Sequence, residues 1–235
     1  MHYRLLIILL VFTNSFKSFS QQYLASSALI ARLDSITMSG SKASHFAELY
    51  LQTTITADEY IQTLPDEAGQ MMKKLEQGFA EYFFRAINAN NTGNKMPGVW
   101  ENYFNGDKLS LLQLKLMGAN AHINGDIWLA LTSSFSLEEI KKLEPIYKKY
   151  SKTINKVFSD LFESAIRSDK RLRNLHSITF GLDKVYGKIM LQKWRNRQLR
   201  LAIFNFKHPE KFERLKKRID IKRERIDRMI MKRLS

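Results

Sequence analysis

Cysteine is absent from this chain of 235 residues, and its absence removes several classes of protein from consideration. Without cysteine the chain forms no disulfide bond, so it would tolerate oxidising surroundings without exploiting them. There is also no cysteine to carry a bacterial lipid anchor or to act as a nucleophile. A Gly-x-Ser-x-Gly elbow and a glycine-rich phosphate loop are missing as well. A nucleophile-based enzyme is therefore disfavoured.

Long hydrophobic runs are also missing. A membrane-spanning helix needs about 20 apolar residues, and the run from Leu5 to Phe12 is much shorter. This run follows the positive charge of Arg4 and precedes the small side chains of Ser18 and Ser20, which is the order of a secretory signal. We therefore expect residues 1–20 to be a cleavable signal peptide and the mature chain to be exported, either to the periplasm or out of the cell.

The composition is typical of a helical globular protein, with only four prolines, 44% hydrophobic residues and 26% charged residues. Apolar residues recur at three- and four-residue steps, and no alternating strand-like run is bounded by turn residues. We predict an all-α fold, a single compact multi-helix bundle. Its expected parts are a helical domain over residues 21–206 and a basic amphipathic C-terminal helix over residues 207–235.

The same periodicity sets the expected limits of the helices, which are 23–36, 44–51, 66–87, 108–132, 178–206 and 209–233. A loop rich in Asn and Gly is expected over residues 88–97. Ser136 and Glu139 form a capping-box pattern that opens one more helix. Pro145 lies about two turns inside that helix, so we expect a kink or break there before a helix resumes over residues 147–166.

The predicted helix 108–132 differs from the others because apolar side chains occur at nearly every angle around it. Such a helix is buried in the centre of a bundle, and its polar side chains must find partners. Helical geometry places Gln113, Asn120 and Asn124 on one side and Lys115, His122 and Asp126 on roughly the opposite side. These six residues are the candidates for a buried binding pocket. Gly118 and Gly125 remove bulk beside the His122 stripe, so a neighbouring element is expected to approach closely.

The segment Leu116-Met-Gly-Ala-Asn-Ala-His-Ile-Asn-Gly-Asp-Ile127 resembles the hallmark L-G-x-N-A-H-I-N-x-D-L of an uncharacterised bacterial domain-of-unknown-function family. Weaker similarities occur at residues 46–53, 79–89, 100–104, 111–113 and 194–195. The resemblance implies one helical domain over about residues 24–205 and leaves the last basic helix as an appendage. It implies no particular activity.

One interpretation of the motif is a metal centre. His122 and Asp126, four residues apart, could both face one zinc or other divalent ion, and a third ligand could come from His45 or Glu48. The His-x-x-x-Asp spacing is also similar to that of zinc-dependent phospholipase C. Those enzymes use several more histidines and an amino-terminal tryptophan, which this chain does not supply. This interpretation would make the protein a metal-dependent hydrolase.

Two other interpretations stay open. In the first, His122 and Asp126 pair with each other or with Lys115, and Asn120 and Asn124 satisfy backbone groups, so the cluster serves only the fold. In the second, the cluster lines a ligand pocket without catalysis. Substitution of His122 would then affect stability in the first case and ligand affinity in the second.

The C-terminal helix carries much of the net charge of +15, because residues 191–235 hold sixteen Lys or Arg against five Asp or Glu. Apolar residues follow a helical stripe along residues 207–235, interrupted by Lys222. Such a basic amphipathic helix suits an anionic membrane surface or an acidic partner. A solvated face that closes the bundle is the alternative. Nucleic acid is disfavoured as a partner because an exported protein seldom meets it.

Overall fold

The computed structural model describes residues 27–155, 159, 163 and 182–233. Every regular element within these ranges is a helix, which confirms the predicted all-α bundle. None of the described helices is long and apolar enough to cross a membrane. The predicted signal peptide, and the predicted helix residues between 164 and 181, lie outside the described residues.

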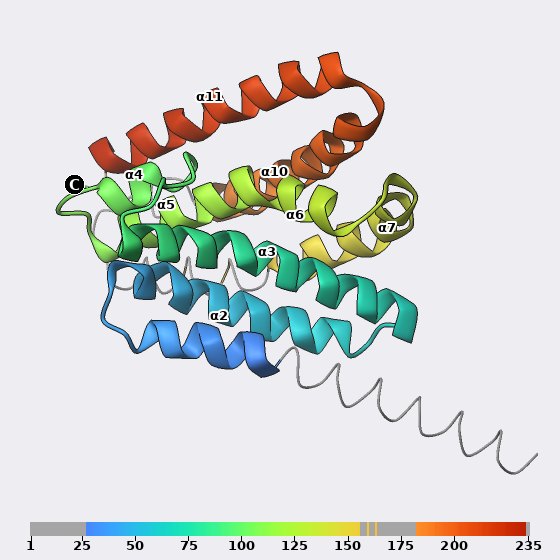
Figure 1. Cartoon of the computed structure of the whole chain (residues 1–235), viewed down its shortest axis with the longest axis horizontal. Helices are drawn as coiled ribbons and strands as arrows, with labels where there is room; N and C mark the ends of the chain where they lie inside the picture. The colour runs from blue at the N-terminus through green and yellow to red at the C-terminus, as the bar shows by residue number, and fades with distance from the viewer. Residues whose placement is uncertain (1–26, 156–158, 160–162, 164–181, 234–235) are drawn as a thin grey trace, which may run out of the picture.

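The bundle is built around a central run of three consecutive elements, α5, η1 and α6. After a helical segment over residues 27–37, the described elements are α2 (Lys42–Ile61), α3 (Asp66–Thr92), α4 (Glu101–Asn105), α5 (Leu111–Ala121), η1 (His122–Asp126), α6 (Ile127–Ser134), α7 (Leu137–Thr153), α10 (Leu182–Lys207) and α11 (Pro209–Arg233). The central run packs against α2 and α3 on one side and against α10 and α11 on the other. Figure 1 shows α11 lying across the top of the bundle and α2 below it.

The continuous helix predicted over residues 108–132 is interrupted, and this is a correction. The structure starts α5 at Leu111, where the Ser110 side chain accepts a hydrogen bond from the Gln113 amide and the Gln113 side chain accepts one from the Ser110 amide. A π-helical turn, η1, follows directly after α5. It spans five residues and contains His122 and Asp126. A π-helical turn adds a residue to the turn and rotates everything after it, so helical-wheel angles do not carry across the motif.

Pro145 does not break its helix, so the expected break is absent. α7 runs without interruption from Leu137 to Thr153 and opens with the predicted capping box of Ser136 and Glu139. Proline has no N–H group, so the main-chain carbonyl of Lys141 loses its usual donor. Both Pro145 and Lys141 lie on the exposed side of the helix. Water can reach that carbonyl there, which limits the cost of the missing hydrogen bond.

Two glycines of the motif make room for neighbours, as the sequence indicated. A Cβ atom on Gly118 would come within 2.4–2.7 Å of Phe46 side-chain carbons from α2. A Cβ atom on Gly125 would come within 2.7–2.9 Å of the Val99 side chain. Real Cβ atoms do not approach so closely, so Gly118 sets the spacing between α5 and α2, and Gly125 sets the spacing between η1 and the loop before α4.

Candidate ligand pocket and its polar surroundings

His122 and Asp126 face each other inside the core. The Nδ1 atom of His122 and the Oδ2 atom of Asp126 are 2.8 Å apart and share a hydrogen bond, and both side chains are almost completely buried. The same carboxylate oxygen accepts a second hydrogen bond, of 3.0 Å, from Nε1 of Trp100. Phe79 stacks on the imidazole with ring centroids 3.5 Å apart. The ring orientation of His122 is therefore fixed by a carboxylate on its edge and an aromatic ring on its face.

Burial controls the protonation of this pair. Loss of water lowers the pKa of His122 well below its usual range, and the positive charge of Arg195 lowers it further. Burial also raises the pKa of Asp126, against the opposing effects of the Trp100 hydrogen bond and the charge of Arg223. His122 is thus held neutral, because the low-dielectric surroundings disfavour an imidazolium.

On one side of the central run, the polar residues Gln113, Asn120 and Asn124 are grouped as predicted. Gln113 and Asn120 both point toward α11. The side-chain amide of Asn120 donates to the main-chain carbonyl of Arg223 at 2.9 Å and to Oδ1 of Asp227 at 2.8 Å. Its oxygen accepts from the side chain of Asn124 at 2.9 Å. Gln113 donates to the carbonyl oxygens of residues 230 and 231 at 3.1 and 3.3 Å. These amides connect the motif to the last helix.

The other predicted ligands do not join His122. Glu48 is exposed and forms an ion pair of 2.9 Å with Lys115, and His45 stands one turn before Glu48 on α2. Within the described part of the chain, no group of three or more His, Asp or Glu side chains is arranged to hold a metal ion. The Nδ1 atom of His122 is already used by Asp126, so these two side chains are turned toward each other and not toward a common ion.

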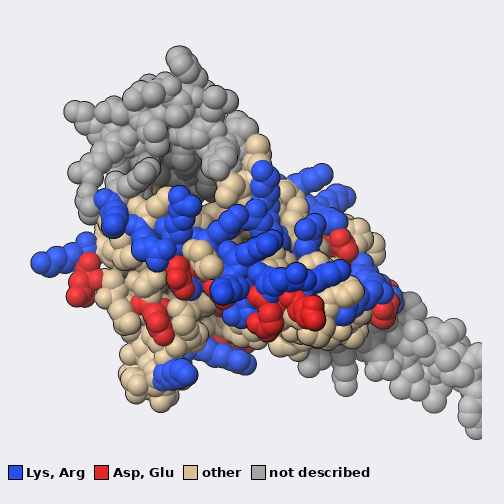
Figure 2. Space-filling model, turned by 90° about the horizontal axis from the view of Figure 1, so that it is seen from above, with Lys and Arg blue, Asp and Glu red and all other residues tan. Residues whose placement is uncertain are grey.

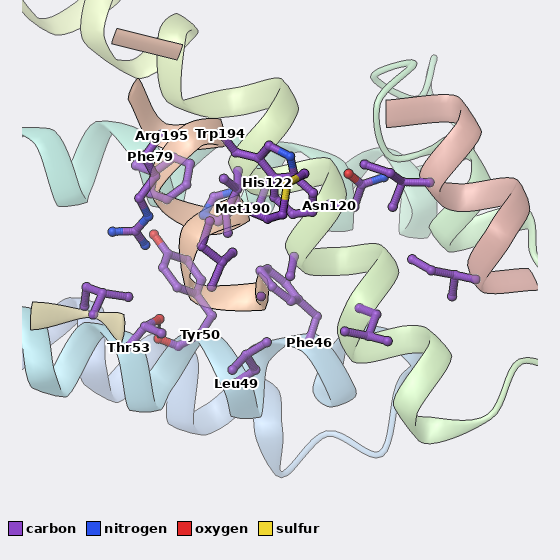
Figure 3. Close-up of a pocket in the computed structure, with 18 of the residues that line it drawn as sticks. Phe46, Leu49, Tyr50, Thr53, Phe79, Asn120, His122, Met190, Trp194 and Arg195 are labelled. Atoms are coloured by element: carbon purple, nitrogen blue, oxygen red, sulfur yellow. Dashed lines mark hydrogen bonds between the residues drawn. The ribbon is translucent and has the colours of Figure 1, made fainter. Parts of the chain in front are cut away.

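A cavity of about 430 Å³ lies between α2, the central run, α10 and α11. Its volume falls within the range of small-molecule sites. Figure 3 shows Phe46, Leu49 and Tyr50 of α2 on one side of the cavity, facing Met190 and Trp194 of α10. The wall is mostly apolar, and its polar or charged members are Tyr50, Thr53, Glu76, Asn120, His122, Tyr150, Trp194 and Arg195.

Four of these members, Tyr50, Glu76, Tyr150 and Arg195, lie near one another. Figure 3 shows Tyr50 reaching from α2 toward Arg195 of α10. Burial raises the pKa of Glu76, although a hydrogen bond from Tyr150 and the charge of Arg195 oppose the rise. The Arg195 guanidinium also lies 5.5 Å from the ring centroid of Tyr150. This part of the cavity wall therefore carries both charge and hydroxyl groups.

Two buried polar atoms on the cavity wall lack a hydrogen-bond partner among the described residues: the Tyr50 hydroxyl and Nε2 of His122. Both residues line the cavity. Buried polar groups in proteins are almost always paired, so each unpaired one calls for an explanation. A neutral His122 with Nδ1–H directed at Asp126 would present a free acceptor at Nε2.

Of the six pocket residues expected from the sequence, Asn120 and His122 line the cavity. Gln113, Asn124 and Asp126 are buried outside the cavity lining, and Lys115 forms its ion pair with exposed Glu48. Sequence reasoning did not find the roles of Glu76 and Arg195, because charged residues on helices usually face solvent. A usable signal existed for Glu76. It follows Leu75 and lies three residues before Phe79 in the apolar stripe of α3, so its side chain had to enter or border the core.

A comparison with known protein families gives a match to the sequence of this chain. The profile described as "Family of unknown function (DUF5995)" matches residues 26–233. The chain belongs to this family. The match covers the central motif, every described helix that lines the cavity, and α11 as well, so it extends past the range of about 24–205 that the motif similarities suggested. No curated protein and no solved structure matches the chain.

Proposed function

We propose that this member of the DUF5995 family binds one small amphiphile, an apolar molecule with a single hydrogen-bonding group, in the cavity between α2, the central run and α10. The observation that carries this proposal is the pair of unpaired buried atoms, the Tyr50 hydroxyl and His122 Nε2, on the wall of an apolar cavity. A ligand hydroxyl or carboxyl group can satisfy both atoms, which the described residues leave unpaired.

The apolar wall supports the rest of the ligand. Leu49, Leu116, Ile123, Met190 and Leu191 surround the cavity with aliphatic side chains from several helices. An aliphatic chain or terpene-like ring system placed there gains the free energy of leaving water, about 25 cal/mol per Å² of apolar surface. The unpaired Tyr50 hydroxyl and His122 Nε2 then orient the molecule, because its hydrogen-bonding group must lie next to them.

The direct experiment fills the cavity with a larger side chain. Ala119 lines the cavity, so Ala119→Trp should occupy part of the volume and abolish binding of the neutral fluorescent probe N-phenyl-1-naphthylamine. Ala31→Trp is the matched control, since Ala31 is exposed on the first helical segment and away from the cavity. Equal probe binding by the wild type and the Ala119 variant, with both folded by circular dichroism, would refute the proposal.

We also propose that the protein acts outside the cytoplasm. The support is the charged, apolar and small-residue order of residues 1–20. Amino-terminal sequencing of protein recovered from the periplasm or medium should begin at Gln21. An uncleaved product retained in the cytoplasm would contradict this.

A further inference from the structure

The outward side of α11 is strongly basic. Its exposed side chains include eight basic residues against three glutamates, the basic ones being Lys211, Arg214, Lys217, Arg218, Lys222, Arg225, Arg228 and Lys232. Figure 2, viewed onto this side, shows Lys and Arg side chains gathered in a band with few acidic ones. Glu224 lies near two arginines, Arg223 and Arg228, so one carboxylate is shared between two cations.

An apolar residue stands in the middle of this basic surface. Ile221 is 53% exposed, and helical spacing places Arg218 and Arg225 one turn on either side of it. The opposite side of the same helix is fixed to the bundle by Ile219, Arg223 and Asp227, all buried. The basic surface with Ile221 at its centre therefore faces away from the protein.

The inner edge of the same helix forms part of the cavity wall. Ile226, Met229 and Ile230 line the cavity, and Met229 is also 40% exposed. Because one side chain both borders the cavity and reaches the surface, the rim of the cavity lies at the edge of the basic surface of α11. A ligand that leaves past Met229 emerges beside Arg225 and Lys222, which are four and seven residues away on α11.

We propose that the outer surface of α11 docks on an anionic lipid bilayer, and that the amphiphile exchanges between the bilayer and the cavity at the Met229 rim. The charge of this surface is complementary to anionic headgroups, and an exposed isoleucine among arginines is suited to the boundary between headgroups and acyl chains. An acidic protein or a nucleic acid would match the charge but would gain little from Ile221. The exchange step rests on the proposed amphiphile binding, whereas the docking step does not.

The test reverses charge on α11 and compares it with the same change elsewhere. The variant Arg218→Glu/Lys222→Glu/Arg225→Glu alters three exposed residues of the outer surface. The control Lys142→Glu/Lys149→Glu/Lys152→Glu alters three exposed lysines of α7 and changes the net charge equally. This comparison is better than deleting residues 207–235, because deletion would leave buried Asn120 without its partners on α11.

Sedimentation with vesicles containing phosphatidylglycerol gives the first result. Full-length mature protein and the α7 variant should bind, and the α11 variant should bind at least about a hundredfold more weakly, since each basic residue near an anionic surface contributes about a factor of five. Absence of wild-type binding to these vesicles would overturn the proposal. Equal loss in both variants would also overturn it, as would tighter binding to a single-stranded oligonucleotide than to the vesicles.

Transfer of N-phenyl-1-naphthylamine from the loaded protein to the vesicles gives the second result. The wild type should transfer the probe faster to anionic vesicles than to phosphatidylcholine vesicles, and the α11 variant should lose this difference while still binding the probe. Equal transfer to both kinds of vesicle by the wild type would overturn the exchange step. If the wild type fails to bind the probe at all, the proposed function fails, and sedimentation still decides the docking step.

Discussion

The side chain of Gln198 on α10 holds the π-helical turn by hydrogen bonds to Asn124 and Trp128. Its Nε2 atom donates to the carbonyl oxygen of Asn124 at 2.9 Å, and its Oε1 atom accepts from the backbone amide of Trp128 at 3.3 Å. A π-helical turn disrupts the regular ladder of backbone hydrogen bonds, and buried backbone groups need partners. One glutamine from another helix therefore supplies a donor and an acceptor where the motif segment requires them.

Replacing Gln198 with leucine should destabilise the protein by about 2–4 kcal/mol, because two buried backbone groups lose their partners. Urea unfolding followed by circular dichroism measures the change. Gln192→Leu on the same helix is the control, since Gln192 is partly exposed and forms no described hydrogen bond to the central run. A cost for Gln198→Leu no larger than that of the control would show that the turn does not depend on this side chain.

Gly118→Ala should destabilise the protein by about 1–3 kcal/mol, although alanine is normally the better helix former. The added methyl group would overlap the Phe46 ring, so α5 and α2 must move apart. Gly98→Ala is the matched control, because its nearest neighbour would be the Glu101 carboxylate at 3.9 Å. The double variant Gly118→Ala/Phe46→Leu should recover part of the loss. Strict additivity of the two changes in free energy of unfolding would contradict the contact.

Tyr50→Phe separates a binding role from a structural one. The variant removes a buried hydroxyl that has no described partner, so the ligand-free protein should be as stable as the wild type or about 1 kcal/mol more stable. Displacement of N-phenyl-1-naphthylamine by 1-dodecanol should nevertheless require about tenfold more alcohol, because the hydroxyl no longer pairs with the ligand.

Tyr60→Phe is the control for that measurement. The Tyr60 hydroxyl is also buried and unpaired among the described residues, but Tyr60 does not line the cavity. Its removal should leave displacement by 1-dodecanol unchanged. If both tyrosine variants alter displacement equally, the Tyr50 hydroxyl is not a ligand contact.

The neutrality of His122 predicts a pH dependence of stability. Its pKa in the folded protein lies below the unfolded value of 6.5, so the unfolded chain takes up a proton that the folded chain does not. The contribution of His122 is present above pH 6.5 and is lost as the pH falls below it. Between pH 7 and pH 5 the loss is at most about 2 kcal/mol, at 1.36 kcal/mol per pH unit for one proton.

The comparison uses His122→Asn, which keeps a donor near the position of Nδ1 but does not titrate. Asp126 and Glu76 have raised pKa values and change stability with the opposite sign, and they are present in both proteins. The wild-type advantage in free energy of unfolding should therefore shrink as the pH falls from 7 to 5. Parallel stability curves for the two proteins would mean that His122 is protonated in the folded state.

The sequence predicted the fold class, most helices and the motif, because these depend on local periodicity. α11 was predicted at its observed limits, Pro209–Arg233, since Pro209 starts it and the amphipathic pattern continues without a break. The close approaches at Gly118 and Gly125 followed from the absence of a side chain on a buried helix. His122 and Asp126 form the contact that one of the three interpretations of the motif expected.

The cavity could not be predicted, because it depends on contacts between helices far apart in the sequence. Arg195 and Glu76 interact although more than a hundred residues separate them in the sequence, and nothing local to Arg195 marks it as buried. The π-helical turn also escaped prediction. The side chain that pairs with its Asn124 carbonyl belongs to Gln198, 74 residues later in the sequence, so residues 122–126 alone do not reveal this partner.

The hydrogen bonds from Gln113 and Asn120 to α11 also bear on when the protein can fold. Both side chains are buried, and their partners on α11 lie more than a hundred residues later in the sequence. Until that helix emerges from the ribosome, the core holds unsatisfied amides and an open apolar side. The native bundle therefore cannot be completed before α11 has been synthesised, and a shorter nascent chain would remain open to proteases and to aggregation.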